Sequence, residues 1–375
     1  MLKVLRKKIG QKPTKNFDRF NQYVWSQELT NRRDYAYFKQ LLQRGIDPAF
    51  EAYFTPDRRF DIRLDEVTWG GVKQDGIPPL RQPAMIAAAD ADYLAGTDVI
   101  FGIEINGEAR AYPKRILAWH EMFVDTIAGV PLIGVYCTLC GTVILYETSV
   151  GGTDYDLGTS GFLYRSNKLM YDRATQSLWS TMAGKPVIGP LADHGIELPI
   201  RSIVTTSWSE WRRRHPDTQV LSLETGHDRN YEEGVAYRDY FGSEHRMFET
   251  PFDDDRLNDK DEVLALRFIP AAETPVAISA SFLKRNRIYE NNFGGQSFVI
   301  LTDAGRANRV YERPADVGFV AWDKRHTATD HHGVEWTLTE SALTAPDGRT
   351  LKRLPAHRAF WFGWHGAFPD TVLIK

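Results

Sequence analysis

The chain has 375 residues, of which 42% are hydrophobic and 25% charged, and its formal net charge is −3. This composition is typical of a folded protein with room for two or three domains. It has no basic excess that would neutralise phosphates, so we expect no nucleic-acid partner. No apolar run approaches the roughly 20 residues that cross a bilayer, so we expect no membrane span. The first fifteen residues lack the apolar segment of a secretory signal, which favours a cytoplasmic location.

Residues 1–80 are predicted to form a helical N-terminal extension. Apolar residues recur at helical spacing between positions 16 and 50, among them Tyr35, Phe38 and Leu42. This periodicity predicts one or two amphipathic helices whose apolar face packs against the rest of the protein.

Beyond about residue 80, short runs of strand-forming residues alternate with turn signals. One run, "DVIFGIEINGEARAYP", contains Asn106 and Gly107 between alternating residues. This pair predicts a tight hairpin, because both residue types tolerate the positive φ angles of such turns. The fold class is therefore predicted to be predominantly β (α+β).

Two halves of the chain resemble each other. The segment "DVIFGIEINGEARAYPKRIL" resembles "EVLALRFIPAAETPVAISASFL", "VILYET" resembles "NRVYER", and "WSEWRRRHPDTQVL" resembles "FWFGWHGAFPDTVL", with Trp211 matching Trp364. The matches occur in the same order, which predicts two related β-rich repeats at 81–228 and 229–375. Only the first repeat contains cysteines, so we expect the second to be a structural copy.

The two cysteines of the chain, Cys137 and Cys140, lie between two strand-like runs in "VYCTLCGTVILYET". In thioredoxin-like proteins such a pair begins a helix, whereas these flanks and Gly141 predict the tip of a hairpin. A Cys-x-x-Cys-Gly tip brings both sulfurs to one side, as in rubredoxin-like and zinc-ribbon knuckles. The pattern favours a metal site, while a disulfide and a redox-active dithiol remain alternatives.

The segment "AWHEMFVD", which precedes the cysteines, contains candidates for a third metal ligand. His120 and Glu121 precede Cys137 by 17 and 16 residues, and in a helix adjacent side chains point about 100° apart, so both cannot face the cysteines squarely. We predict metal ligation by Cys137, Cys140 and His120. Glu121 would be a further ligand or proton-transfer group, and Asp125 would orient the imidazole.

A Cys2His site with an open position suits a transition metal, copper before zinc or iron. The corresponding function is a metal-dependent oxidoreductase acting on a small molecule. Two alternatives remain: a binding module braced by structural zinc or a disulfide, and a thiol oxidoreductase in which Cys137 attacks and Cys140 resolves. The sequence does not predict the oligomeric state.

A second polar stretch, "NKLMYDRATQSLWS", contains Asp172 and Arg173. One interpretation is a turn in which the Asp172 side chain binds the local backbone. The other is a wall of the active site, with Arg173 binding an anion or pairing with Asp172.

Several motifs together resemble one family. "AYPKRILAWHEMFVD", "VYCTLCGTVILYE", "LMYDRATQSLWS", "WSEWRRRHPDTQVL", "ETGHDRNYEEGVAYRDY" and "FWFGWHGAFPDT" are similar to the DUF3179 family, from about residue 80 to the C-terminus. The family pattern has Cys-Pro-Leu-Cys-Gly where this chain has Thr138 in place of proline. Many members carry an export signal or lipid anchor, which is not seen here. The resemblance implies no established activity.

Overall fold

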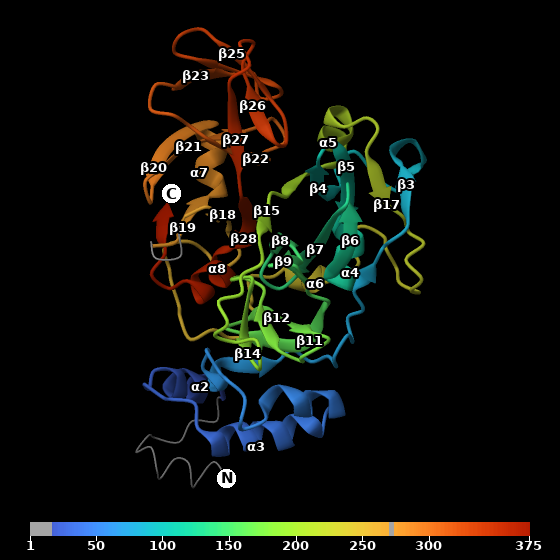
Figure 1. Cartoon of the computed structure of the whole chain (residues 1–375), viewed down its shortest axis with the longest axis vertical. Helices are drawn as coiled ribbons and strands as arrows, with labels where there is room; N and C mark the ends of the chain where they lie inside the picture. Colours follow the sequence, from blue (N-terminus) through green and yellow to red (C-terminus); the bar gives the residue numbers. More distant parts are fainter. Residues whose placement is uncertain (1–16, 270–273) are drawn as a thin grey trace.

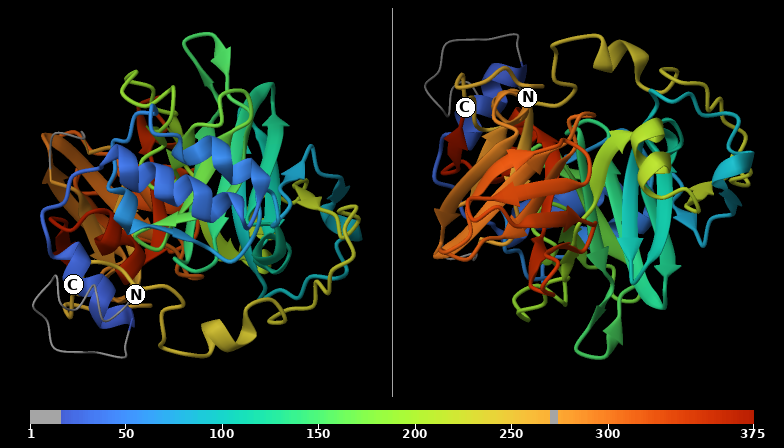
Figure 2. Two further views of the ribbon diagram at one scale, coloured as in Figure 1. Left: turned by 90° about the horizontal axis from the view of Figure 1, so that it is seen from below. Right: turned by 90° about the horizontal axis from the view of Figure 1, so that it is seen from above.

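The computed structural model describes residues 17–269 and 274–375 (Figure 1). The predicted helical extension is present as α2 (Phe17–Trp25) and α3 (Arg33–Arg44), while its first sixteen residues lie outside the described part. Seen from below, α3 lies across one end of the molecule (Figure 2). No helix in the described ranges has the length and apolar character needed to cross a membrane.

The face of α3 that packs is opposite to the predicted one. Phe38 and Leu42 are 58% and 54% exposed, whereas Lys39 is buried. Lys39 Nζ donates to the carbonyl oxygen of Leu64 at 3.0 Å, and burial lowers the pKa of Lys39 to about 8. The helices are confirmed, but the expected packing of the apolar side chains is wrong for α3, because backbone carbonyl oxygens beneath this helix accept hydrogen bonds from the buried lysine.

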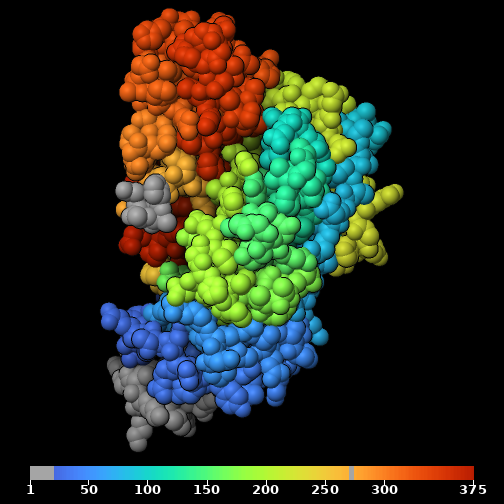
Figure 3. Space-filling model, viewed as in Figure 1, coloured from blue at the N-terminus to red at the C-terminus, as the bar shows by residue number. Residues whose placement is uncertain are grey.

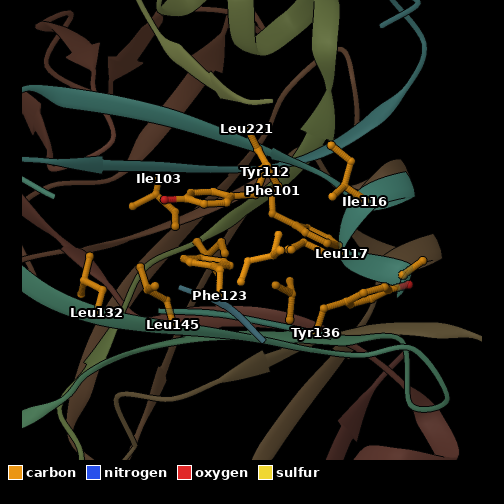
Figure 4. Packing of buried hydrophobic residues seen from close by; sticks show 14 of the residues in the cluster. Phe101, Ile103, Tyr112, Ile116, Leu117, Phe123, Leu132, Tyr136, Leu145 and Leu221 are labelled. Atoms are coloured by element: carbon orange, nitrogen blue, oxygen red, sulfur yellow. The ribbon is translucent and has the colours of Figure 1, made fainter. Parts of the chain in front are cut away.

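The first repeat consists of two five-stranded sheets that face each other. One sheet has the order β16 (Val204–Ser207), β4 (Val99–Ile105), β5 (Glu108–Pro113), β17 (Gln219–Leu221) and β3 (Met85–Ala87). The other has the order β15 (Ile200–Arg201), β8 (Thr142–Glu147), β7 (Val130–Cys137), β6 (Met122–Ile127) and β2 (Leu80–Arg81). Phe101 and Tyr112 from the first sheet meet Phe123 and Leu145 from the second in a common core (Figure 4).

Two short helices lie in this repeat, and the first of them connects the two sheets. α4 (Lys114–His120) joins β5 to β6, and α5 (Trp208–Arg214) joins β16 to β17. The β4–β5 hairpin turns at Asn106 and Gly107, both with positive φ, which confirms the predicted turn.

The second repeat has the same strand order. Its first sheet contains β28 (Ala356–Phe360), β18 (Glu262–Leu266), β19 (Val276–Ser279) and β29 (Val372–Ile374). Its second sheet begins with β20 (Ile288–Phe293), β21 (Gln296–Thr302), β22 (Asn308–Glu312) and β27 (Thr350–Leu354), and continues through β26 (Ala342–Thr344), β25 (Glu335–Leu338), β24 (Thr327–Asp330) and β23 (Phe319–Trp322). α7 (Ala280–Arg285) and α8 (Trp361–Ala367) occupy the places of α4 and α5.

The match between repeats extends to side chains. Trp211 Nε1 donates to Thr218 Oγ1 at 3.0 Å, and Trp364 Nε1 donates to Thr371 Oγ1 at 2.9 Å. Strands β17 and β29, which follow these threonines, pair in parallel with β5 and β19, the third strand of each sheet in the order given above. The structure therefore contains the two related repeats, which lie side by side when seen from above (Figure 2). Domain limits at residues 80 and 228 remain predictions.

A further sheet lies between the repeats and the N-terminal helices. It has the order β1 (Val67–Trp69), β11 (Leu157–Tyr164), β12 (Asn167–Asp172), β13 (Leu178–Ser180) and β14 (Lys185–Ile188). The remaining elements are β9 (Ser149–Val150), β10 (Thr153–Asp154), α6 (Arg238–Phe241) and the 3-10 turns Pro48–Phe54, Leu64–Glu66 and Ala88–Asp90. The N-terminal segment forms the lower end of the molecule beneath this sheet (Figure 3).

Candidate functional site

The cysteine pair lies at the tip of the β7–β8 hairpin, as predicted. Cys137 is the last residue of β7 and pairs with Thr142 at the start of β8. Gly141 has φ +57, a left-handed conformation that glycine adopts without strain. Cys137 and Cys140 form a disulfide with a Cα–Cα distance of 5.4 Å. The hairpin therefore brings the two sulfurs together without a helix.

The loop is enclosed by distant parts of the chain. The carbonyl oxygen of Cys140 accepts from the backbone N–H of Phe360 at 2.7 Å, and that of Leu139 accepts from the Tyr240 hydroxyl at 2.6 Å. A Cβ atom at Gly363 in α8 would lie 2.8 Å from Cys140 Cβ. Cys140 is fully buried while Cys137 is 4% exposed. Both cysteines are therefore buried, and Cys137 is the less deeply buried of the two.

Glu121 is the acidic group beside this loop. Helix α4 ends at His120, and Glu121 takes the left-handed conformation with φ 56, which turns the chain into β6. Its Oε1 accepts from the Thr138 hydroxyl at 2.7 Å, and its Oε2 accepts from Lys168 Nζ at 2.6 Å. The Tyr237 hydroxyl donates to Oε1 at 3.2 Å. A buried, paired carboxylate is thus tied to the residue that follows Cys137.

The His120 imidazole bonds to groups outside the cysteine loop. Its Nδ1 lies 2.9 Å from the carbonyl oxygen of Pro78, which can only accept, so Nδ1 carries the proton. Nε2 lies 2.6 Å from the Tyr231 hydroxyl and accepts from it in the neutral imidazole. Burial lowers the pKa of His120 to about 4. The reversal of the chain at Glu121 explains why Glu121, and not His120, reaches the loop.

The described residues contain no group of three or more His, Cys, Asp or Glu side chains placed to hold a metal ion. Both ring nitrogens of His120 are engaged elsewhere, so the predicted set of Cys137, Cys140 and His120 is not brought together. Metal ligation by these residues remains a prediction for a rearranged or reduced loop.

Asp125 lies further along β6 and does not contact His120. It pairs across the strands with Leu132, five residues before Cys137. Its Oδ2 accepts from the Tyr112 hydroxyl at 2.6 Å and from the Arg110 guanidinium. Asp125 therefore ties β5 to β6 rather than orienting the imidazole.

Asp172 and Arg173 form their side-chain hydrogen bonds with residues outside the cysteine loop. Asp172 Oδ2 accepts from the backbone N–H of Thr175 at 2.7 Å and from its hydroxyl at 2.6 Å, which confirms the turn interpretation. Arg173 does not pair with Asp172, because its guanidinium donates to Asp75 Oδ2 at 2.6 Å. The two residues fasten the β12–β13 turn.

Sequence reasoning missed Lys168 and Tyr237. Lys168 lies next to the apolar run "LMY" in the strand "NKLMYD", where every residue is buried. A lysine in such a strand requires a buried anion or carbonyl partner, which was the available signal. Tyr237 offered no signal of its own, since its partner Glu121 is 116 positions away in the sequence.

Two cavities approach the site. One of about 670 Å³ is lined by Pro78, Trp119, Arg229 and Tyr237, and Tyr237 connects it to Glu121. The other, of about 290 Å³, lies between the repeats and touches Gly141 as well as Tyr136, the residues that flank the cysteine pair. The two cavities therefore reach neighbours of the cysteine pair and of Glu121, while neither cysteine is part of their lining.

Comparison with known proteins gives one family. Residues 74–371 match the model described as "Protein of unknown function (DUF3179)". No curated protein matches the chain. Among solved structures, the crystal structure of the quaternary ammonium Rieske monooxygenase CntA with an inhibitor shows 9% identity and a TM-score of 0.15, covering 75% of this chain and 69% of that one. A likeness at that TM-score supports no conclusion about fold or function.

Proposed function

The chain belongs to the DUF3179 family, whose description assigns no activity, and we propose that it is a redox protein in which Cys137 and Cys140 alternate between disulfide and dithiol. The observation that carries the proposal is the buried Glu121 carboxylate, bonded to Thr138 inside the Cys-x-x-Cys loop and to Lys168. Thiol–disulfide exchange needs a group that moves protons to and from sulfur, and a carboxylate held in this position suits that role.

The steps are those of exchange through a mixed disulfide. In the dithiol form, the Cys137 thiolate attacks one sulfur of a small disulfide substrate, and the first substrate thiolate leaves and takes up a proton. Cys140 then loses its proton and attacks Cys137 Sγ, so that the second substrate thiolate leaves and the protein disulfide forms. A dithiol reductant returns the pair to its starting state. Glu121 accepts the proton that Cys140 loses and passes it to the leaving thiolate.

The surroundings of the two sulfurs support different roles for them. Cys140 Sγ lies 3.2 Å from the carbonyl oxygen of Ser166, which accepts from the thiol when the pair is reduced. Such a contact favours the protonated thiol over the thiolate until the mixed disulfide forms. Cys137, the more exposed of the two, is then the attacking sulfur. The enclosure of the loop favours small-molecule substrates over protein disulfides.

A transition metal bound by the reduced pair is the second candidate. It is favoured by the hairpin tip, which places both sulfurs on one side, and copper is expected before zinc or iron. Glu121, which is bonded to Thr138 within the loop, is better placed than His120 to add a ligand. As a third ligand, His120 would have to give up its bonds to Pro78 and Tyr231.

A redox titration with alkylation and mass spectrometry tests the first candidate. We expect a midpoint between about −270 and −120 mV, the range of catalytic pairs, and a value below about −300 mV would instead mark a structural disulfide. Glu121→Gln is expected to slow reduction by a small dithiol about 10- to 100-fold. Glu147→Gln, at the far end of the same hairpin, is the matched control and should leave the rate unchanged.

A metal titration of the reduced protein separates the two candidates. Stoichiometric binding of copper(I) or zinc that blocks alkylation of both cysteines would replace the exchange mechanism with a metal site. Free alkylation of both thiols in the presence of equimolar metal supports exchange.

A further inference from the structure

The cavity of about 290 Å³ between the repeats is built from matching positions of both. Val99, at the start of β4, pairs with Ser207, at the end of β16. Glu262, at the start of β18, pairs with Phe360, at the end of β28. All four residues line the cavity. It therefore lies on the approximate symmetry axis that relates the two repeats.

The hairpin loops also meet at this cavity. Gly141 comes from the β7–β8 loop, which contains the cysteines, and Gly305 and Arg306 come from the corresponding β21–β22 loop. Sites formed where two related units meet are common places for ligands, because the units leave a concave seam between them. The second repeat thus forms one wall of a cavity that reaches the cysteine loop.

The charges in this cavity are unbalanced. Glu262 is neutralised by Arg358, whose guanidinium donates to its carboxylate. Among the described residues, no carboxylate lies within 4.0 Å of Lys114 Nζ or of the Arg306 guanidinium, and Lys114 Nζ lies 4.3 Å from the centre of the Phe241 ring. Burial lowers the pKa of Lys114, and Glu262 opposes this shift. Two cations, one from each repeat, thus form no direct ion pair with a described carboxylate, and Glu262 acts on Lys114 only from a longer distance.

Hydroxyl groups complete the lining. Thr97, Thr205 and Thr206 come from the first repeat and line the cavity together with Tyr136, while the Ser207 hydroxyl caps α5 by accepting from the N–H of Glu210. Hydroxyls donate to anionic oxygens, and a half-buried ammonium gains most when such an oxygen replaces water beside it. The cavity volume is at the lower end for small-molecule sites.

We propose that this cavity binds a small dianion, with one anionic group at Lys114 and the neighbouring hydroxyls and the other at Arg306. A dicarboxylate and inorganic phosphate share this chemistry. The site does not depend on the redox function proposed above, although a bound anion would lie against Gly141 beside the cysteine pair.

Calorimetric titration of the oxidised protein with succinate, inorganic phosphate and acetate at low ionic strength tests the proposal. We expect a Kd of about 1 mM or lower for succinate or phosphate and weaker binding of acetate. Preference for succinate would identify a dicarboxylate site, and preference for phosphate a phosphate site. Absence of binding by both dianions, or equal binding of acetate, would overturn the proposal.

Substitutions locate the binding. Lys114→Met keeps the length of the side chain and should weaken binding at least 10-fold. Arg306→Asn should do the same, and because Arg306 is exposed at φ 71, which asparagine tolerates, this variant keeps the test independent of any folding defect at Lys114. Lys352→Met, on an exposed position of β27, is the control. Unchanged binding in both cavity variants would contradict the proposal.

The variant Cys137→Ser/Cys140→Ser separates this proposal from the redox one. It should bind the dianion with unchanged Kd, since neither sulfur supplies the charge that holds the ligand. Loss of binding in this variant alone would place the ligand at the cysteines and overturn the cavity as its site.

Discussion

The β7–β8 and β21–β22 hairpins occupy the same place in the two repeats and contain opposite chemistry. In the first hairpin, the backbone N–H of Tyr136 donates to the carbonyl oxygen of Glu121 at 2.9 Å. In the second hairpin, the backbone N–H of Thr302 donates to the carbonyl oxygen of Arg287, also at 2.9 Å. Glu121 and Arg287 are therefore equivalent, with opposite charges. The next residues along the hairpins are Cys137 and Asp303.

The charged residues of the second hairpin form ion pairs inside the protein. Arg309 donates to Asp303 Oδ2 at 2.8 Å and to Glu340 Oε1 at 2.7 Å. Burial alone would raise the pKa of the Glu340 carboxyl, but the Arg309 charge outweighs it and holds that pKa well below its ordinary value. The first hairpin instead has two sulfurs and a carboxylate that reaches the loop from α4. One scaffold thus supports a buried ionic network in one copy and a disulfide in the other.

Each loop is covered by the opposite repeat. α8 of the second repeat lies against Cys140 through Gly363, and α5 of the first lies against the second loop, where a Cβ at Gly305 would lie 3.0 Å from Glu210 Cγ. Arg214, at the end of α5, is 3.6 Å from Asp303. The second repeat therefore does more than copy the first, because it encloses the cysteine pair.

Breaking the ionic network should have the largest effect. Arg309→Met leaves Asp303 and Glu340 buried without their main cation, and we expect a loss of about 3–5 kcal/mol in the free energy of unfolding. Urea denaturation measures this loss. Arg173→Met, which removes a partly exposed ion pair, is the control and should cost about 1 kcal/mol or less. A loss below 1 kcal/mol for Arg309→Met would show that water reaches the network.

The corresponding change in the first repeat is Lys168→Met. It leaves the Glu121 carboxylate with only the Thr138 and Tyr237 hydroxyls, so we expect a loss of about 2–3 kcal/mol, smaller than at Arg309 because two donors remain. The double variant Lys168→Met/Glu121→Gln should recover part of that loss, since no buried charge is left. Equal stability of the single and double variants would contradict a charged Glu121.

Much of the scaffold was predictable because it depends on local patterns. The Asn106 and Gly107 turn, the cysteine hairpin and the duplication all follow from residue types that fix backbone geometry or recur in order. The site was harder. The left-handed turn at Glu121 decides that the side chain of Glu121, and not that of His120, reaches the cysteine loop. The site also depends on Lys168, which is 47 positions from its partner Glu121 in the sequence. No periodicity encodes either feature, and the inverted packing of α3 likewise depends on tertiary acceptors.

Substitution of two glycines in α8 tests whether this helix constrains the cysteine loop. Gly363→Ala places a methyl group 2.8 Å from Cys140 Cβ, so the helix or loop must shift, and we expect a loss of about 1–3 kcal/mol and a changed rate of disulfide reduction. Gly366→Ala, whose new atom would meet nothing closer than 3.4 Å, is the control. Equal effects of the two would mean that α8 does not constrain the loop.

The last expected effect is confined to acid pH and concerns a histidine present in only one repeat. His357 on β28 pairs with Ala265, and the equivalent residue of the first repeat, which pairs with Gly102, is Val204. Arg267 donates to His357 Nε2 at 3.1 Å, so the ring must stay neutral, and burial together with the Arg267 charge lowers its pKa to about 3.

Because this pKa lies below the ordinary value of about 6.5, the unfolded chain binds a proton between pH 6.5 and 3 that the folded chain does not. The stabilisation by neutral His357 is therefore complete above pH 6.5 and is lost as the pH falls, by at most about 1.4 kcal/mol per pH unit. His357→Gln keeps an acceptor for Arg267 and removes the titration, so its free energy of unfolding should fall less steeply between pH 6 and 4. The exposed His194→Gln should follow the wild type. Parallel pH profiles for wild type and His357→Gln would show that the His357 ring accepts a proton in the folded protein.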